Sequence, residues 1–289
     1  MLRSLSLLAA CLGGLAVSAC SPATEGGTDR HVAVIAHRGA SWDAPEHTIL
    51  SWDLARAQGA DWLEFDVQRT RDGVLVVFHD DSLDRVARGP AEDCSGFLDT
   101  KTWEQLQRCD VGSWFNEAHP DRAKPEYAGL RIPALDDVLA RYGPDARLYL
   151  ELKDAERLPD IAHDLYLALV RHGLAGAGAD TGRVLVQSFV PEALARFRGW
   201  SPGTPLIQLV WDSIPGARLD TALAQVAGYA RGIGPAARIT DARLVEAAHA
   251  KGLLVHPYTV NEEADMRRVL RLGVDGVFTD RPALLRSLF

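Results

Sequence analysis

Seven side chains that can bind a metal, bind phosphate or transfer protons stand at the ends of four short apolar runs. They are His37, Arg38, Glu64, Asp66, His79, Glu151 and Lys153. Glu64 and Asp66 are two residues apart, so on a strand their carboxylates point to the same face. Glu151 and Lys153 have the same spacing. If these runs are parallel strands of a barrel, their carboxyl ends meet at one mouth and bring these groups together.

Carboxylates gathered at one mouth repel one another, which raises their pKa values or destabilises the site. A bound divalent cation removes this repulsion, and ligands that are all oxygen favour Mg²⁺ or Ca²⁺ over Zn²⁺. Arg38 and Lys153 add a positive patch, and a metal ion beside two cations suits a phosphate group. His37 and His79 supply a general acid and a general base that can work near neutral pH.

The elements that must position these groups alternate between β-like runs and helical stretches. The β-like runs are mostly continuous and rich in Val, Leu and Ile, and they lie at Val32–His37, Asp61–Val67, Val74–His79, Arg147–Leu152, Arg183–Phe189, Pro205–Val210, Ala230–Gly234, Leu253–Tyr258 and Val274–Thr279. Such runs are typical of parallel strands that are buried on both faces. The helical patterns lie at Thr48–Gln58, Asp160–His172, Pro191–Arg198, Asp241–Lys251 and Glu262–Leu272. We expect Asp241 and Asn261 to be N-caps, and the order predicts an α/β fold, a TIM-type (β/α)8 barrel.

One β-like run is surplus to the strands of such a barrel. Only the segment Gln68 to Gly73 separates the second run from the third. A parallel crossover needs about a dozen residues or more, so this connection must be a hairpin with Asp72-Gly73 as its turn. Residues 81 to about 131 then break the rhythm with Gly, Pro, Asp and several aromatics. We expect them to form a small insertion after the second-strand hairpin, over one mouth of a single barrel domain of residues 31–289.

The first 19 residues have the layout of a secretory signal, because Arg3 precedes a small and apolar run. That run is shorter than the roughly 20 residues of a spanning helix. It ends in Val17-Ser18-Ala19-Cys20, which resembles the lipobox of bacterial lipoproteins. We therefore expect a signal peptide at 1–19, a lipidated Cys20 and a flexible tether at 20–30. The protein would be exported and membrane-anchored on the periplasmic or cell-surface face; a plain secretory signal would instead make it a soluble periplasmic or secreted protein.

Charge and cysteine usage narrow the choice of partners. Acidic side chains number 39 against 31 basic ones, a formal net charge of -8, which disfavours a nucleic-acid-binding surface. Any membrane attachment would rest on the lipid, and the sequence indicates no protein partner. In an exported chain Cys94 and Cys109 invite a disulfide, with two buried free thiols as the alternative.

Taken in order, these motifs resemble those of the glycerophosphodiester phosphodiesterase family over about residues 32 to 285. The segments that carry the resemblance are His37-Arg38-Gly39, Pro45-Glu46-His47-Thr48, Glu64-Phe65-Asp66-Val67, Thr70-x-Asp72-Gly73, His79-Asp80, Glu151-Leu152-Lys153, Gln187-Ser188-Phe189, Tyr258-Thr259-Val260-Asn261 and Asp275 to Pro282. The resemblance implies a barrel enzyme with one divalent cation, Ca²⁺ or Mg²⁺. It also implies hydrolysis of small glycerophosphodiesters to glycerol 3-phosphate and an alcohol.

By the same resemblance, residues of this chain take specific roles. The implied assignments are metal ligands Glu64, Asp66 and Glu151, an acid–base pair of His37 and His79, and phosphate-binding Arg38 and Lys153. Glu46 lies in the loop after His37 and would orient that histidine or support the site from outside. Two positions depart from the family's usual pattern: His47 stands where Asn is frequent, and Tyr258 stands where Trp is frequent. The first affects a loop contact, because His titrates where Asn cannot, and the second predicts an altered substrate fit.

Two other functions stay open from the sequence. Membrane tethering would suit a lysophospholipase D or phospholipase D-like enzyme that cleaves lipid phosphodiesters. A surface lipoprotein that merely binds phosphodiesters would need a degraded site, yet the histidines and carboxylates are all present. Five aromatic residues are candidates for an alcohol-binding pocket, with ordinary packing as the alternative: Trp42, Trp114, Phe189, Trp211 and Tyr258.

Overall fold

The structure is a computed structural model that describes residues 31–158, 160–179 and 181–289. The expected signal peptide at 1–19, the lipidation site Cys20 and the tether at 20–30 lie outside the described residues. In the part of the chain that is described, no helix combines the length and the apolar character needed to cross a membrane.

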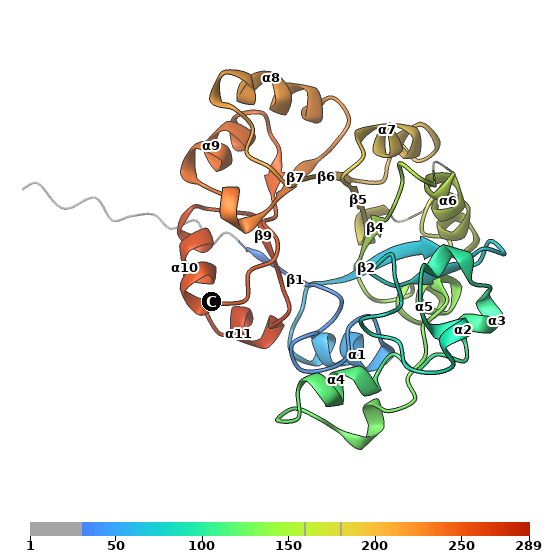
Figure 1. The fold of residues 1–289 in the computed structure, drawn as a ribbon. Helices are drawn as coiled ribbons and strands as arrows, with labels where there is room; N and C mark the ends of the chain where they lie inside the picture. The colour runs from blue at the N-terminus through green and yellow to red at the C-terminus, as the bar shows by residue number, and fades with distance from the viewer. Residues whose placement is uncertain (1–30, 159, 180) are drawn as a thin grey trace, which may run out of the picture. The chain divides into compact units, whose positions relative to one another are not determined.

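A barrel of parallel strands forms the centre of residues 31–289 (Figure 1). The strands are β1 Ala33–Ala36, β2 Trp62–Arg69, β4 Leu148–Leu152, β5 Val184–Ser188, β6 Leu206–Val210, β7 Gly232–Pro235, β8 Leu254–Val255 and β9 Gly276–Thr279. They pair in the order β8-β7-β6-β5-β4-β2-β1-β9. Backbone bonds close the remaining seam, because the Asp275 amide donates to the Val255 carbonyl and the Phe278 amide donates to the Pro257 carbonyl, both at 3.0 Å. The predicted (β/α)8 barrel is confirmed.

The strands form where the chain is continuously apolar, and both of their faces are buried. Inside the barrel, one cluster packs Ile35, Tyr149, Leu185, Ile207 and Phe278 against one another. The opposite faces of the strands pack against the surrounding helices in two larger clusters. A filled interior of this kind leaves only the ends of the strands for a functional site.

Helices surround the strands and return the chain from one strand to the next (Figure 1). Their bounds are α1 Ile49–Ala57, α5 Leu135–Tyr142, α6 Ile161–Arg171, α7 Pro191–Trp200, α8 Gly216–Ala227, α9 Ala242–Ala250, α10 Glu263–Arg271 and α11 Pro282–Arg286, with the short 3₁₀ turns η3 Thr181–Arg183 and η4 Ala237–Ile239. Thr48 caps α1 in a capping box, and Asp241 caps α9 by accepting from the Leu244 amide. The expected N-cap at Asn261 is wrong: α10 begins after Glu262, and the Asn261 side chain bonds Asp280 instead.

The surplus run is the predicted hairpin strand. Strand β3, Leu75–Val77, pairs antiparallel with β2, and Val67 lies opposite Val77. Gly73 in the turn has a φ of 89°, a conformation that glycine adopts without strain. The hairpin carries the chain past the barrel mouth and delivers the segment that contains His79.

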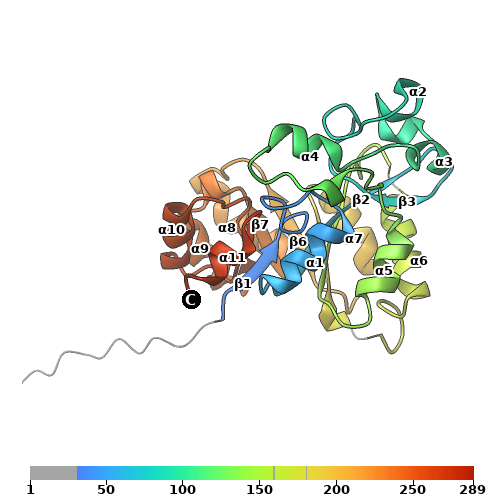
Figure 2. The ribbon, with the colours of Figure 1, turned by 90° about the horizontal axis from the view of Figure 1, so that it is seen from below.

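Residues 81–131 leave the strand–helix alternation and contain only short helices. These are α2 Ala91–Cys94, η1 Leu98–Thr100, α3 Trp103–Leu106, α4 Ser113–Ala118 and η2 Pro125–Tyr127. Cys94 and Cys109 form a disulfide with Cα atoms 5.4 Å apart, inside an apolar cluster that includes Leu83, Val86 and Leu98. Figure 2 shows α2 and α3 close to β3. Helix α4 lies beside α1 at the outer edge of the barrel (Figure 1), and its Phe115 packs in a cluster with Leu50 and Leu54 of α1. This segment therefore has a small core of its own beside the site.

Candidate active site

A cavity of about 520 Å³ opens at the carboxyl ends of the barrel strands. The side chains that line it are His37, Arg38, Asp66, His79, Glu151, Lys153, Gln187, Phe189, Leu209, Trp211, Tyr258, Thr259 and Phe278. Charged and basic groups come from β2 and β4 and from the segments after β1, β3 and β4. Apolar and aromatic groups come mainly from the segments after β5, β6 and β8. The cavity therefore joins a polar half to an apolar half.

His37 follows β1 and is held from the far end of the chain. Its Nδ1 donates to Asp280 Oδ1 at 2.7 Å, although the two residues are 243 positions apart. Ser41 and Asn261 also donate to the Asp280 carboxylate. Burial, reinforced by the positive charge of Arg38, lowers the pKa of His37, while Asp280 opposes this effect. The arrangement leaves a neutral imidazole whose Nε2 is a base.

His79 is the second imidazole of the cavity and follows strand β3. Its Nδ1 bonds Asp80 Oδ1 at 2.6 Å. Burial opposes ionisation of Asp80, but the bonds from His79 and Arg85 hold the pKa of Asp80 well below its usual range. Each histidine of the site thus has its own carboxylate partner, which fixes the ring orientation.

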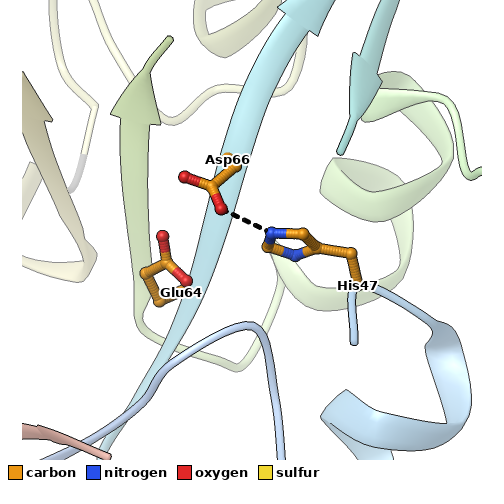
Figure 3. Close-up of side chains that lie close together, drawn as sticks. All are labelled: His47, Glu64 and Asp66. Atoms are coloured by element: carbon orange, nitrogen blue, oxygen red, sulfur yellow. Dashed lines mark hydrogen bonds and ion pairs between the residues drawn. The ribbon is translucent and has the colours of Figure 1, made fainter. Parts of the chain in front are cut away.

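The predicted pair on β2 is buried at the base of the mouth. Glu64 and Asp66 are each 1% exposed and project from the same strand (Figure 3). His47 faces them from the loop before α1, and its Nε2 lies 2.7 Å from Asp66 Oδ2. One ligand atom from each of these three residues lies within 4.8 Å of the others. This triad is a possible metal-binding group.

The triad differs from the predicted ligand set in its third member. Glu151 lies beside Asp66 in the strand register, yet its Oε1 is 3.1 Å from Lys153 Nζ. Its Oε2 accepts a bond from Gln187 Nε2 at 3.3 Å. Glu151 therefore stays beside Asp66, since Lys153 Nζ contacts both carboxylates, but it is not a member of the compact triad that His47 completes. His47 stood out in the sequence only as a departure from the usual Asn.

The two predicted phosphate-binding cations lie on either side of Asp66. Arg38 Nε is 3.6 Å from Asp66 Oδ2, and Lys153 Nζ is 3.9 Å from Asp66 Oδ1. The Arg38 amide donates to Glu64 Oε2 at 2.7 Å, so the segment after β1 is bonded to a carboxylate of β2. Of the two roles expected for Glu46, orienting His37 or supporting the site from outside, the contacts fit the second. Glu46 accepts from Arg38 Nη1 at 3.1 Å, and it is Asp280 that bonds Nδ1 of His37.

The donors at this mouth fit a divalent cation and an anionic ligand. Burial and the charges of Asp66 and Glu151 raise the pKa of Glu64 well above its usual value. These three carboxylates together therefore lack compensating positive charge. Within the described residues, the buried side-chain polar atoms without a hydrogen-bond partner include Arg38 Nε, His47 Nδ1 and Gln187 Oε1. Such atoms are costly to bury unpaired, and here they gather at one site.

The apolar half of the cavity contains three of the five aromatic candidates. The centroid of the Tyr258 ring lies 6.0 Å from that of the Phe189 ring and 6.4 Å from that of the Trp211 ring. Phe189 is 41% exposed and Trp211 is 58% exposed, so both are accessible to a ligand. Trp42 and Trp114 do not line this cavity, and each lies beside an arginine side chain.

Several residues of the site were not assigned by sequence reasoning. Asp280 was part of a quoted motif, and Asp80 directly follows His79, but neither carried a role. The signal for both was a carboxylate directly after a β-like run, and only Asp80 also stands next to a histidine in the sequence. Gln187 stands at the end of β5 and bonds Glu151, which the run of Gln-Ser-Phe alone did not reveal.

Comparisons with known proteins agree with this geometry. The glycerophosphodiester phosphodiesterase of Bacillus subtilis is 40% identical over 99% of this chain and 97% of its own length. A crystal structure of a glycerophosphoryl diester phosphodiesterase homologue from Silicibacter pomeroyi superposes with a TM-score of 0.77 at 27% identity, covering 91% of this chain and 94% of that one.

An Oleispira antarctica phosphodiesterase, solved with the product sn-glycerol-3-phosphate, superposes with a TM-score of 0.73 at 30% identity. That alignment covers 88% of this chain and 95% of the other. The profile of the glycerophosphoryl diester phosphodiesterase family matches residues 37–284. The chain therefore belongs to the glycerophosphoryl diester phosphodiesterase family.

Proposed function

We propose that this protein hydrolyses glycerophosphodiesters to glycerol 3-phosphate and an alcohol. The observation that carries the proposal is that His37 and His79 line one cavity with Arg38, Lys153 and Asp66. Two carboxylate-oriented imidazoles, two cations and an acidic group are what hydrolysis of a phosphodiester needs. The family membership and the product-bound relative support the same reaction.

The carboxylates at the mouth of the barrel would hold one divalent cation, Ca²⁺ or Mg²⁺. Glu64 and Asp66 would be ligands, with His47 from the compact triad or Glu151 from the neighbouring strand β4 as a further ligand. When bound, such an ion stabilises negative charge on the phosphate oxygens. The high pKa of Glu64, which burial and neighbouring carboxylates cause, supports the need for this added positive charge.

The chain's own residues would bind the phosphate and move the protons. Arg38 and Lys153 flank Asp66 and would bind the phosphate oxygens, and Arg38 Nε, which has no hydrogen-bond partner among the described residues, supplies a donor. His37 would accept at Nε2 the proton of the attacking oxygen, which is that of water or of the glycerol 2-hydroxyl, because Asp280 occupies Nδ1 and burial keeps the ring neutral. Attack by the 2-hydroxyl would form a cyclic phosphate, which water then opens to glycerol 3-phosphate. His79 would donate a proton to the departing alkoxide oxygen.

A coupled assay for glycerol 3-phosphate tests this proposal. The soluble form from Ser21 onward would be incubated with glycerophosphocholine, with chelator, and then with Mg²⁺ or Ca²⁺ restored. We expect release that the chelator abolishes and one of these ions restores. No release from any glycerophosphodiester of a panel would overturn the proposal.

An assay of choline release separates the lipid-cleaving alternative, because cleavage of the monoacyl form yields choline and an acylated glycerol phosphate that the glycerol 3-phosphate assay does not detect. The apolar half of the cavity, with its exposed Phe189 and Trp211, is the observation in favour of an acylated substrate. Glycerophosphocholine and its monoacyl form would be compared at equal concentrations. Faster hydrolysis of glycerophosphocholine supports the proposed function, and faster cleavage of the monoacyl form supports lysophospholipase D activity.

We also propose that the protein is exported and anchored through lipid on Cys20. The support is the sequence Val17-Ser18-Ala19-Cys20 after an apolar run. Mass spectrometry of the mature protein from a bacterial host should show cleavage before Cys20 and an acylated cysteine. Membrane association that persists in a Cys20→Ala variant would contradict the anchor.

A further inference from the structure

We propose that Arg85, from the segment 81–131, is a positioning residue that fixes both the His79 side and the Arg38 side of the active site. The inference rests on the proposed phosphodiesterase function. It adds a residue that does not line the cavity and acts only through groups that do.

The guanidinium of Arg85 bridges two carboxylates with all three of its nitrogens. Nη1 and Nη2 donate to the two oxygens of Glu46 at 2.9 and 2.7 Å. Nε and Nη2 donate to the two oxygens of Asp80 at 2.6 and 3.1 Å. Paired bonds of this kind define the direction of both carboxylates, which a single charge contact would not do.

Each of these carboxylates holds one group of the cavity. Glu46 Oε1 also accepts from Arg38 Nη1 at 3.1 Å, on the side where the phosphate would bind. Asp80 Oδ1 also bonds His79 Nδ1 at 2.6 Å, which sets the orientation of the imidazole. Arg85 is therefore the link between two chains of hydrogen bonds, one of which ends on Arg38 and the other on His79.

The segment that carries Arg85 is built to hold it still. Its neighbours Leu83 and Val86 are 0% and 2% exposed and pack in the apolar cluster that contains the disulfide. The guanidinium carbon lies 5.4 Å from the centre of the Trp114 ring, which covers it from α4. Arg85 thus gives the segment 81–131, with its separate small core, a role at the site.

Two substitutions test the role of Arg85, and one matched control accompanies them. Arg85→Met removes the donors, and Arg85→Lys keeps the charge but cannot bridge both carboxylates in pairs. The control is Arg108→Met, since Arg108 also bridges two carboxylates, Asp93 at 2.8 Å and Glu104 at 2.7 Å, in the same segment but away from the cavity.

The test separates positioning from folding through kcat, KM and melting temperature. We expect Arg85→Met to lower kcat about 10- to 100-fold with a smaller change in KM, as loss of an outer orienting contact does. Arg85→Lys should have a kcat between those of Arg85→Met and wild type. Arg108→Met should keep the wild-type kcat, although its melting temperature should change about as much as that of Arg85→Met.

The proposal fails if folded Arg85→Met keeps the wild-type kcat, or if Arg108→Met lowers kcat as much as Arg85→Met does. Should Arg85→Met not fold, Arg85→Lys and Arg85→Gln decide, since both must lower kcat in folded protein. If the wild-type protein releases no glycerol 3-phosphate, the proposed function itself is contradicted. Failure of the proposed function is therefore distinguishable from failure of the role of Arg85.

Discussion

The two halves of the barrel mouth are built on different principles. On the polar half, nearly every group is tied by hydrogen bonds: His37 to Asp280, His79 to Asp80, and Lys153 to Glu151. On the apolar half, Phe189 and Trp211 stand partly exposed around Tyr258. Preorganised polar groups stabilise charge in a reaction, whereas exposed aromatic faces offer contact area to whatever group arrives. We infer that one half performs the chemistry and the other selects the alcohol.

The largest effect should come from removing an imidazole of the polar half. His37→Ala or His79→Ala should lower kcat about 10²- to 10⁴-fold, because each loses a proton-transfer group. Circular dichroism should show an intact fold in both variants. Near-normal turnover in either purified variant would refute the role assigned to that histidine.

A smaller loss should follow when the partner of His37 is changed without removing the ring. In Asp280→Asn, the amide can present its nitrogen to Nδ1 and favour the wrong tautomer, so kcat should fall about 10- to 100-fold. Steady-state kinetics check this prediction. A kcat equal to that of wild type would show that Asp280 does not set the tautomer.

The apolar half should respond in specificity and not in turnover. Trp211→Ala should change the ratio of kcat/KM between glycerophosphodiesters with different alcohols by about 2- to 10-fold, as loss of an aromatic contact predicts. Trp200→Ala is the matched control, because Trp200 is 38% exposed on α7 and stacks on Tyr166 outside the cavity. If both substitutions change this ratio equally, or if Trp211→Ala lowers kcat as much as the loss of a histidine, the assignment of chemistry and specificity to separate halves is contradicted.

The smallest effect concerns pH. A base must be neutral, and burial lowers the pKa of His37, so the acid limb of kcat/KM should lie below pH 6.5, the usual pKa of His. Asp280 raises the pKa of His37, so in Asp280→Asn this limb should move to still lower pH. Profiles of kcat/KM against pH would test the sign. An acid limb above pH 6.5 would contradict the assignment of His37 as base.

The barrel and the polar half were largely predictable from sequence, for local reasons. Apolar runs mark the strands, the Asp72-Gly73 turn marks the hairpin, and functional groups of a barrel stand where its strands end. Glu64 and Asp66 were found because a spacing of two on a strand fixes a common face.

What the sequence did not reveal depends on contacts made only when the barrel closes. Asp280 reaches His37 because β9 pairs with β1, across 243 positions. His47 approaches Asp66 from a loop in which its own φ is 54°, and no spacing rule predicts that geometry. Arg85 lies in a segment without periodicity, whose path depends on its own core.

Metal binding tests the central claim most directly, because it does not depend on choosing the right substrate. Equilibrium dialysis of the protein from Ser21 onward with Ca²⁺ and with Mg²⁺ would be compared with Glu64→Gln and Asp66→Asn. We predict one divalent ion bound per wild-type chain, and at least tenfold weaker binding in both variants, as expected when a charged ligand is lost. A wild-type chain that binds neither ion, or folded variants that bind as tightly as wild type, would contradict the account.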